Sequence, residues 1–376
     1  MFPVTDSFIF KITSTCNLNC TYCYMFNKGD NSFLNRPKVM EIDIAFIAVR
    51  KIIKYAEKHH IKNISIVLHG GEPLLAGYAW FEKFLKYVKN ITPSNLNVAI
   101  LIQTNGTLLD MKWIRILNLY GVGLGLSLDG PAKWNDINRI DHKGNGSYEK
   151  VKKSIELLLS LGDNSPGCGV LIVANPEYPS QEIYKHFIEL GINNMDFLWP
   201  DYHHDDPSPW KKGALAKYYI DLFDIWFNQE NYKVKIRWFE EAIRLLLGDK
   251  CKTRGLGLGL SPVTDIVIES DGSIEPADTL RACSNGMTRV GLNIRNHEIE
   301  SIYDNELFQQ GLTNIDELPA KCKNCKAYEI CGGGKFTHRW SKENKFSNPS
   351  VHCSDLLTTL EHISMKINEL TKRTGT

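Results

Sequence analysis

The chain has 376 residues, 43% hydrophobic and 23% charged, which is enough for a large core and a second, smaller domain. Its 44 Lys and Arg nearly balance its 43 Asp and Glu, which argues against a general nucleic-acid or membrane surface. No apolar run is long enough to span a bilayer and no signal peptide is visible, so we expect a cytoplasmic protein whose ten cysteines bind metal more often than they form disulfides.

The N-terminal half alternates strand patterns with amphipathic helix patterns. The predicted strands are Phe8–Thr13, Ile64–His69, Val98–Gln103, Val122–Ser127, Gly169–Val173 and Met195–Trp199. The predicted helices are Asp43–His59, Tyr78–Lys89, Asp110–Leu119, Tyr148–Leu161 and Ser180–Leu190. Six successive βα units predict an α/β fold with a parallel sheet, and functional loops at the C-terminal ends of its strands.

Three cysteines follow the first predicted strand: Cys16, Cys20 and Cys23. Three thiolates can hold a [4Fe–4S] cluster and leave one iron open to an external ligand. A structural zinc site is the alternative, although zinc favours a closed set of four ligands. The CxxxCxxC spacing, with Tyr22 just before the third cysteine, resembles the radical S-adenosylmethionine (SAM) family. The resemblance implies that the open iron binds SAM, that Tyr22 packs near the adenine, and that SAM cleavage yields a 5′-deoxyadenosyl radical.

Polar residues at the ends of the next strands extend this resemblance. The run Gly70-Gly71-Glu72-Pro73 is similar to the family's GGEP motif, which implies contact with the amino group of SAM. Two further strand ends and the segment after them carry side chains suited to the ribose and carboxylate of SAM: Gln103, Asn105, Ser127, Asp129 and Arg139. Capping of turns is the alternative role for Gln103, Asn105 and Asp129.

A second set of cysteines lies near the C-terminus: Cys322, Cys325, Cys331 and Cys353. Four thiolates can saturate an iron–sulfur cluster or a zinc ion. Their spacing resembles the SPASM domain of radical SAM peptide maturases, which implies an auxiliary [4Fe–4S] cluster. Upstream, Ile266–Ile274 predicts a hairpin that turns at Asp271-Gly272. We therefore expect a partial (β/α)6 radical SAM barrel over residues 1–205, a helical bridge over 206–250, and a SPASM-like domain with a C-terminal helix over 251–376.

The chain departs from this resemblance at two positions. The resemblance implies cysteines of a first auxiliary cluster there, but this chain has Ala277 and Lys335. Cys251 and Cys283 are candidate ligands of a modified first cluster, or buried thiols. Asp278 follows Ala277, and the resemblance implies that it lies near the substrate as a base or peptide-positioning carboxylate. Capping of the hairpin is its alternative role.

The stretch from Trp199 to Trp210 contains Asp201, His203 and His204, and we expect it to cross the barrel mouth and contact substrate. Metal binding by its adjacent His and Asp residues is a weaker alternative. Together with the amphipathic helix predicted at Leu215–Phe227, this loop resembles FxsB-type and cyclophane-forming maturases of ribosomal peptides. Because the chain begins at the first strand, we expect no separate leader-recognition domain.

These patterns predict a radical SAM oxidoreductase that crosslinks a ribosomally made precursor peptide. The adenosyl radical would abstract a hydrogen from Cβ, and the carbon radical would attack a neighbouring aromatic ring to give a carbon–carbon or ether macrocycle. A flavodoxin- or ferredoxin-type protein would donate the electron. One alternative is an anaerobic sulfatase-maturating enzyme, which oxidises Cys or Ser to formylglycine. Another is a non-catalytic iron–sulfur carrier or scaffold, which would need no SAM pocket.

Overall fold

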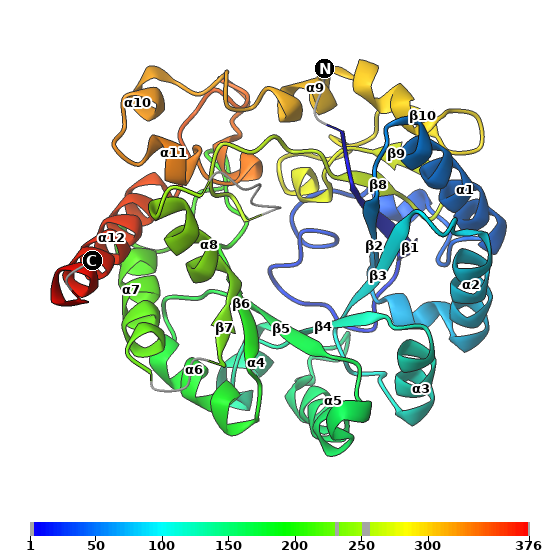
Figure 1. Cartoon of the computed structure of the whole chain (residues 1–376), viewed down its shortest axis with the longest axis horizontal. Helices are drawn as coiled ribbons and strands as arrows, with labels where there is room; N and C mark the ends of the chain where they lie inside the picture. Colours follow the sequence, from blue (N-terminus) through cyan, green and yellow to red (C-terminus); the bar gives the residue numbers. More distant parts are fainter. Residues whose placement is uncertain (1–3, 230–232, 250–255, 375–376) are drawn as a thin grey trace. The chain divides into compact units, whose positions relative to one another are not determined.

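The computed structural model describes residues 4–229, 233–249 and 256–374 (Figure 1). The chain divides into two compact units that interleave in sequence. Unit 1 comprises residues 1–128, 132–169 and 264–312, and unit 2 comprises 129–131, 170–263 and 313–376. The boundaries predicted at residues 205 and 250 describe consecutive domains and stay a prediction.

Unit 1 contains seven neighbouring strands among its described residues, in the order β10-β9-β8-β1-β2-β3-β4. Their bounds are β1 Ser7–Thr13, β2 Asn63–Gly70, β3 Asn97–Thr104, β4 Gly123–Ser127, β8 Ile266–Ile268, β9 Ser273–Glu275 and β10 Leu292–Asn293. Strands β1 to β4 are parallel, β8 runs parallel to β1, and β9 is antiparallel to β8. The predicted strands of this unit and the predicted hairpin are therefore confirmed.

Helices follow these strands, and α1, α2 and α3 lie along one side of β1 to β3 (Figure 1). The helices of unit 1 are α1 Ile42–Lys58, α2 Tyr78–Ile91, α3 Met111–Leu119, α4 Ala132–Asn138, α5 Tyr148–Ser160 and α9 Glu306–Leu312, with 3₁₀ turns η1 Ser32–Asn35, η2 Pro73–Ala76, η3 Gly162–Asn164, η4 Asp278–Ala282 and η5 Ile299–Asp304. Helix α3 begins where the Asp110 carboxylate accepts a hydrogen bond from the Trp113 amide at 2.9 Å. Helix α4 was not predicted, because a short helix that buries only Asn135 has no apolar period.

The core of unit 1 centres on β1, which is buried on both faces as expected of a strand in a parallel α/β sheet. Phe8, Phe10 and Ile12 are 0% exposed, and Phe10 contacts Phe84 of α2. Lys11 points to the other face and is also 0% exposed. A charged side chain so deeply buried requires partners, which are described below.

Unit 2 contains β5 (Cys168–Val173) from Val170 onward, β6 Asn194–Leu198 and β7 Lys235–Ile236, which pair in parallel. Its helices are α6 Ser180–Glu189, α7 Ala214–Phe227, α8 Arg237–Leu246, α10 Ala320–Lys323, α11 Tyr328–Cys331 and α12 Cys353–Thr374, with the 3₁₀ turn η6 Phe336–Arg339. Helix α12 lies beside α7 (Figure 1). The stacking of Trp199 on Tyr219, with ring centroids 4.2 Å apart, ties the end of β6 to α7. No helix among the described residues is both long and apolar enough to cross a membrane.

Candidate functional site

The first cysteine loop follows β1 and is held in place by hydrogen bonds to its sulfur and backbone atoms. The Leu18 amide donates to Cys16 Sγ at 3.4 Å, and the Cys23 amide donates to the Cys20 carbonyl at 3.1 Å. Burial raises the pKa of the Cys16 thiol to about 12 and also raises that of Cys23. These half-buried thiols would bind iron as thiolates, because coordination to a metal deprotonates a thiol that partial burial otherwise keeps protonated. Three thiolates would leave one iron of a four-iron cluster open, and the binding of iron by these three residues stays a prediction.

Two glycines at the end of β2 set the position of this loop. A Cβ at Gly70 would lie 2.3 Å from the Thr13 carbonyl oxygen, and one at Gly71 would lie 2.1 Å from that of Thr15. Both distances are too short for any side chain. The close approach lets the Gly71 amide donate to the Thr13 carbonyl at 3.0 Å, and the Glu72 amide donate at 2.9 Å to the carbonyl of Thr15, which directly precedes the first cysteine. The glycines of the GGEP motif therefore have a structural role in addition to the predicted contact with SAM.

Glu72 is 0% exposed and joins the ends of β2 and β3. Its carboxylate accepts hydrogen bonds from Thr104 Oγ1 at 2.6 Å, the Asn105 amide at 2.8 Å and the Leu74 amide at 3.0 Å. Burial raises the pKa of this carboxyl group, and these bonds act in the opposite direction. The side chain is thus largely engaged by the protein, and its contact with the amino group of SAM stays a prediction.

The other predicted SAM contacts of unit 1 fall into two groups. Gln103 donates to Ser127 Oγ at 2.8 Å, and Arg139 donates to the Tyr22 hydroxyl at 2.9 Å. Asn105 instead faces the cysteine loop, with its Nδ2 3.6 Å from Cys16 Sγ. The structure thus brings Arg139 to the aromatic residue of the cysteine motif. Asp129, which belongs to unit 2, accepts a hydrogen bond from the Val173 amide at 3.0 Å, as a turn-capping residue would.

The segment around Arg139 also forms hydrogen bonds with the cysteine loop. Sequence reasoning missed this contact. The Asn19 amide donates to the Ile140 carbonyl at 2.7 Å, and the Thr21 amide donates to the Asn138 carbonyl at 3.1 Å. His142 Nε2 lies 2.9 Å from the Cys16 carbonyl oxygen. Backbone pairing of this kind depends on no particular side chain, so the sequence carries no signal for it.

A cluster of polar side chains surrounds the buried Lys11. Sequence reasoning had singled out only one of its members, Asp278, and missed the others. We call it the Lys11 tetrad, and its members are Lys11, Tyr24, His69 and Asp278. The Lys11 ammonium donates to the Tyr24 hydroxyl at 2.7 Å, lies 3.1 Å from His69 Nδ1 and forms an ion pair with the Asp278 carboxylate. Tyr24 also donates to Asp278. A lysine inside an otherwise apolar strand was the sequence signal that could have found it.

The surroundings of Asp278 and His69 in the tetrad shift the pKa values of both side chains. Burial would raise the pKa of Asp278, but the Lys11 ammonium beside it holds that pKa well below its usual range. Burial, together with Lys11, lowers the pKa of His69 to about 3, so the imidazole is neutral. His69 Nδ1 faces two donors, Lys11 and the Gly70 amide at 2.8 Å, so its proton lies on Nε2. The tetrad therefore combines an ionised carboxylate with a neutral imidazole that donates from Nε2.

Buried ion pairs hold the hairpin that precedes Asp278. The Arg281 guanidinium, 0% exposed, contacts the carboxylates of Glu269 at 2.5 Å and Glu275 at 2.9 Å. Arg36 pairs with the same two glutamates, at 2.7 Å to Glu269. These contacts tie β8 and β9 to the segment after the cysteine loop. They fix the start of η4, where Asp278 lies.

In unit 2, the four predicted cysteines of the SPASM-like region come together. Cys322, Cys325, Cys331 and Cys353 all line one small cavity of about 80 Å³. Among the described residues, no three or more His, Cys, Asp or Glu side chains converge closely enough to hold a single metal ion. Thiols spaced around a cavity fit a multi-atom cluster better than one tetrahedral zinc ion.

Comparison with known proteins identifies the family. Residues 10–192 match the Radical SAM superfamily. The protein is a radical SAM enzyme. It is 27% identical over 373 residues to the cysteine-type anaerobic sulfatase-maturating enzyme of Clostridium perfringens (strain 13 / Type A), with 96% of each chain covered. The expected α/β radical SAM fold, the use of SAM, and the presence of [4Fe–4S] clusters including an auxiliary one are confirmed, and the non-catalytic scaffold is excluded.

Solved structures agree with this assignment. The structure of native anSMEcpe with bound AdoMet and Cp18Cys peptide matches the enzyme with a TM-score of 0.83 and 25% identity, over 98% of this chain and 99% of that chain. Streptococcus suis SuiB bound to its precursor peptide SuiA matches with a TM-score of 0.59 and 18% identity, over 93% of this chain and 76% of that chain. The second match is a likeness of fold alone.

The residues present do not fit the first auxiliary cluster that the family resemblance implies. Position 277 is alanine, and the ammonium of Lys335 lies 3.4 Å from the Asp201 carboxylate and 3.3 Å from the Trp199 carbonyl oxygen. Burial would raise the pKa of Asp201, but Lys335 lowers it to about 2, so the pair is ionic. Cys283 is a buried thiol of unit 1 at the end of η4, and its ligation of iron stays a prediction. Cys251 lies outside the described residues.

The loop from Trp199 to Trp210 is bound to the cysteine-rich segment of its own unit. The His204 amide donates to the Trp340 carbonyl at 3.0 Å, its Nε2 lies 2.8 Å from the Pro349 carbonyl oxygen, and Asp205 accepts from the Lys342 amide at 2.8 Å. His203 is 4% exposed. The side chains are thus engaged by protein groups. The alternative of a metal site here is not supported, and the substrate contact stays a prediction.

Proposed function

We propose that the enzyme oxidises Cβ of a cysteine or serine in a peptide substrate to an aldehyde, the reaction of anaerobic sulfatase maturation. The observation that carries this proposal is the match to sulfatase-maturating enzymes over nearly the whole of both chains. The sulfatase-maturation alternative drawn from the sequence is therefore better supported than the prediction of peptide crosslinking. The bond-forming cyclophane activity stays a prediction, because the match to SuiB is a likeness of fold alone.

Cys16, Cys20 and Cys23 would hold the cluster to which SAM binds, with Tyr22, Gly70 and Gly71 among the groups that contact SAM. Bound there, the cluster and SAM supply the 5′-deoxyadenosyl radical that removes a hydrogen atom from the substrate. The protein would position the Cβ–H bond against that radical.

The substrate chemistry then requires one electron and one proton to leave. A side chain R–CH₂–XH, where X is sulfur or oxygen, becomes R–CH•–XH when it loses a hydrogen atom. Loss of an electron and a proton gives R–CH=X. If X is oxygen, this is already the aldehyde, and if X is sulfur, water converts the thioaldehyde into the aldehyde and hydrogen sulfide.

The low pKa of Asp278 constrains the order of these losses. A carboxylate held ionised by Lys11 is a weak base, so it takes a proton readily only from a strong acid. Once the electron has left, the protonated thioaldehyde or aldehyde is such an acid. We therefore assign Asp278 as the proton acceptor, with electron loss before or together with proton loss. Tyr24, which donates to Asp278, would orient the carboxylate.

His69 supplies a different function at the same place. Its neutral imidazole donates only from Nε2, so it suits a carbonyl of the bound peptide and does not suit the role of base. The peptide substrate, an electron-donor protein of the flavodoxin or ferredoxin type, and a cytoplasmic location all belong to this proposal.

The decisive experiment supplies peptides that differ only in having Cys, Ser or Ala at the target position, together with SAM and dithionite under anaerobic conditions. Formylglycine formation, detected by hydrazide capture and mass spectrometry, is expected from Cys or Ser and not from Ala. Loss of two hydrogens from an aromatic-containing peptide without an aldehyde would instead support crosslinking and overturn the proposal.

A further inference from the structure

The side chain of Asn105 lies against the sulfur of the first cysteine in the radical SAM motif. Its Nδ2 donates to Cys16 Sγ at 3.6 Å, and the Leu18 amide donates to the same sulfur at 3.4 Å. Asn105 is 6% exposed, so this contact is largely shielded from water, and all three residues belong to unit 1. If Cys16 binds iron, its sulfur is a thiolate, which accepts hydrogen bonds more strongly than a neutral thiol.

Neighbouring hydrogen bonds determine which end of the Asn105 amide faces the sulfur. The Thr107 amide donates to Asn105 Oδ1 at 3.0 Å, and a backbone N–H group can only donate. The oxygen of Asn105 is therefore turned toward Thr107, as in a capped turn, and the nitrogen toward the cysteine loop. One proton of Nδ2 goes to Asn17 Oδ1 at 2.9 Å, which leaves the other for Cys16 Sγ.

Three side chains form a closed ring of hydrogen bonds, which we call the Asn105 ring. Asn105 Nδ2 donates to Asn17 Oδ1, Asn17 Nδ2 donates to Thr107 Oγ1 at 2.8 Å, and Thr107 Oγ1 donates back to Asn105 Oδ1 at 2.7 Å. Each side chain both donates and accepts, so the three bonds polarise one another in the same direction. The ring therefore holds the Asn105 amide in place beside the sulfur.

The backbone of Asn105 is held separately, by the glutamate of the GGEP motif. The Asn105 amide donates to the Glu72 carboxylate at 2.8 Å, and Glu72 is 0% exposed. The motif that the family resemblance assigns to SAM thus also positions the residue that reaches the cysteine sulfur.

Hydrogen bonds to the cysteine sulfurs of an iron–sulfur cluster raise its reduction potential, because they stabilise the additional negative charge of the reduced state. We propose that Asn105 raises the reduction potential of the cluster held by Cys16 through this bond, and that it does not contact the ribose of SAM. The inference rests on the predicted binding of a cluster by Cys16 and does not depend on formylglycine formation. A higher potential lets a weaker reductant deliver the electron that cleaves SAM.

The test measures the reduction potential of the reconstituted holoenzyme in the absence of SAM and peptide. An anaerobic redox titration is followed by electron paramagnetic resonance, and the signal that changes shape when SAM is then added belongs to the cluster with an open iron. Equilibrium binding of SAM is measured in parallel, because a contact with the ribose would show there. Iron and sulfide analysis verifies that each variant keeps the cluster content of the parent.

Asn105→Leu removes the amide at similar size, so the side chain no longer donates to the sulfur. We expect the ratio of reduced to oxidised cluster at a fixed potential to fall about tenfold, which corresponds to about 59 mV for a one-electron couple. The affinity for SAM should be unchanged. If the leucine variant does not hold its cluster, Asn105→Asp keeps the shape and replaces the donor by a negative charge, so the potential should fall at least as far.

Thr107→Val is the matched control within the Asn105 ring. It removes the hydroxyl group of the ring but keeps the Thr107 amide, which still turns the nitrogen of Asn105 toward the sulfur. The potential should therefore stay near that of the parent. A merely structural role of the ring would instead make the valine and leucine variants behave alike.

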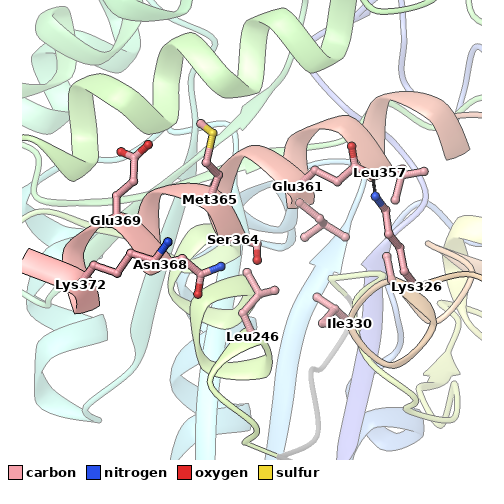
Figure 2. Close-up of a pocket in the computed structure, with 12 residues that line it drawn as sticks. Leu246, Lys326, Ile330, Leu357, Glu361, Ser364, Met365, Asn368, Glu369 and Lys372 are labelled. Atoms are coloured by element: carbon pink, nitrogen blue, oxygen red, sulfur yellow. Dashed lines mark ion pairs between the residues drawn. The ribbon is translucent and has the colours of Figure 1, made fainter. Parts of the chain in front are cut away.

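Lys326→Met is the control for the second set of cysteines. Lys326 directly follows Cys325 in unit 2, and Figure 2 shows it paired with Glu361 beside a groove along α12. Loss of this charge should leave the potential of the SAM-responsive signal unchanged, because any shift that it causes belongs to the auxiliary cluster.

Two results would overturn the proposal. In the first, Asn105→Leu and Asn105→Asp keep the potential of the parent, or a control variant lowers it equally. In the second, both Asn105 variants bind SAM more weakly at an unchanged potential, which would make Asn105 a SAM contact. Absence of any SAM-responsive signal from the parent would overturn the assignment of the cluster to Cys16, and this inference with it.

Discussion

The ammonium of Lys11 and the carboxylate of Asp278 form an ion pair in which the lysine side chain is 0% and the aspartate side chain 10% exposed. The pair joins the first strand of the sheet to the turn that follows the β8–β9 hairpin. Its two members are therefore interdependent, for stability as well as for the proposed chemistry.

Lys11→Met should destabilise the protein by roughly 3–5 kcal/mol, because it leaves the Asp278 carboxylate buried without its counter-ion. Lys11→Met with Asp278→Asn should recover much of this loss, since neither charge then remains. Guanidinium unfolding of the two single variants and the double variant measures the coupling. Strictly additive effects would mean that the pair contributes nothing jointly.

Asp278→Asn should lower aldehyde formation by roughly 10²–10⁴-fold, the effect of losing a general base. Hydrogen abstraction should continue, and deuterium should pass from Cβ-labelled peptide into 5′-deoxyadenosine. Tyr24→Phe, which removes only the donor to the carboxylate, serves as the milder comparison. If the Asn variant makes product at the normal rate, Asp278 is a structural residue and another acceptor must exist.

His69 should make the fold sensitive to acid. Its pKa is about 3 in the folded protein and about 6.5 when unfolded, so between these values the unfolded chain binds the extra proton. Stability therefore falls as the pH drops below about 6.5. His69→Gln should lose less stability than the parent between pH 7.5 and pH 5, measured by denaturant unfolding. Burial also lowers the pKa of His352 to about 3, so the His69→Gln variant should keep part of the acid sensitivity.

The reconstituted enzyme should contain roughly eight irons per chain, from two four-iron clusters. Replacing Cys16, Cys20 and Cys23 together by alanine should leave about four, because the second set of cysteines is independent. Because positions 277 and 335 lack cysteines, we expect Cys251→Ala and Cys283→Ala to leave the iron content unchanged, and a loss of iron would support their predicted ligation of a first auxiliary cluster. Iron and sulfide analysis with Mössbauer spectroscopy checks this, and about twelve irons would show that a first auxiliary cluster assembles without cysteines at positions 277 and 335.

Arg139→Ala should weaken SAM binding by about 1.5–3 kcal/mol, the range for a hydrogen bond to a charged group. Part of the effect could come from release of Tyr22, to which Arg139 donates. Tyr22→Phe removes that bond alone and separates the two contributions. Equilibrium binding of SAM to the holoenzyme is the measurement, and an unchanged dissociation constant for Arg139→Ala would remove it from the site.

Much of this architecture follows from local patterns in the sequence. The strand periodicity predicted both ends of each strand from β1 to β6 to within one residue, and Asp271-Gly272 predicted the hairpin. Both predictions succeed because hydrophobic period and turn chemistry are local properties. The cysteine spacing also indicated two sets of thiols, and the structure gathers the second set around one cavity. Iron binding by both sets stays a prediction.

What the sequence did not reveal depends on long-range contacts. Lys11, Tyr24 and His69 come from separate elements, and no spacing rule joins them to Asp278. The interleaving of the two units is also a property of contacts distant in sequence. The full-length comparison, and not any local motif, favoured formylglycine formation over crosslinking.

The contact of Gly70 and Gly71 with residues 13–16 bears on how the enzyme can be engineered. Main-chain atoms at the end of β2 lie so close to the segment before Cys16 that no side chain can be added there without moving it. Even one methyl group at position 71 would displace the backbone that leads into Cys16. In a saturation library, this corner should therefore be the least permissive part of the SAM site, and redesign for new peptides should begin at His69 and leave the two glycines unchanged.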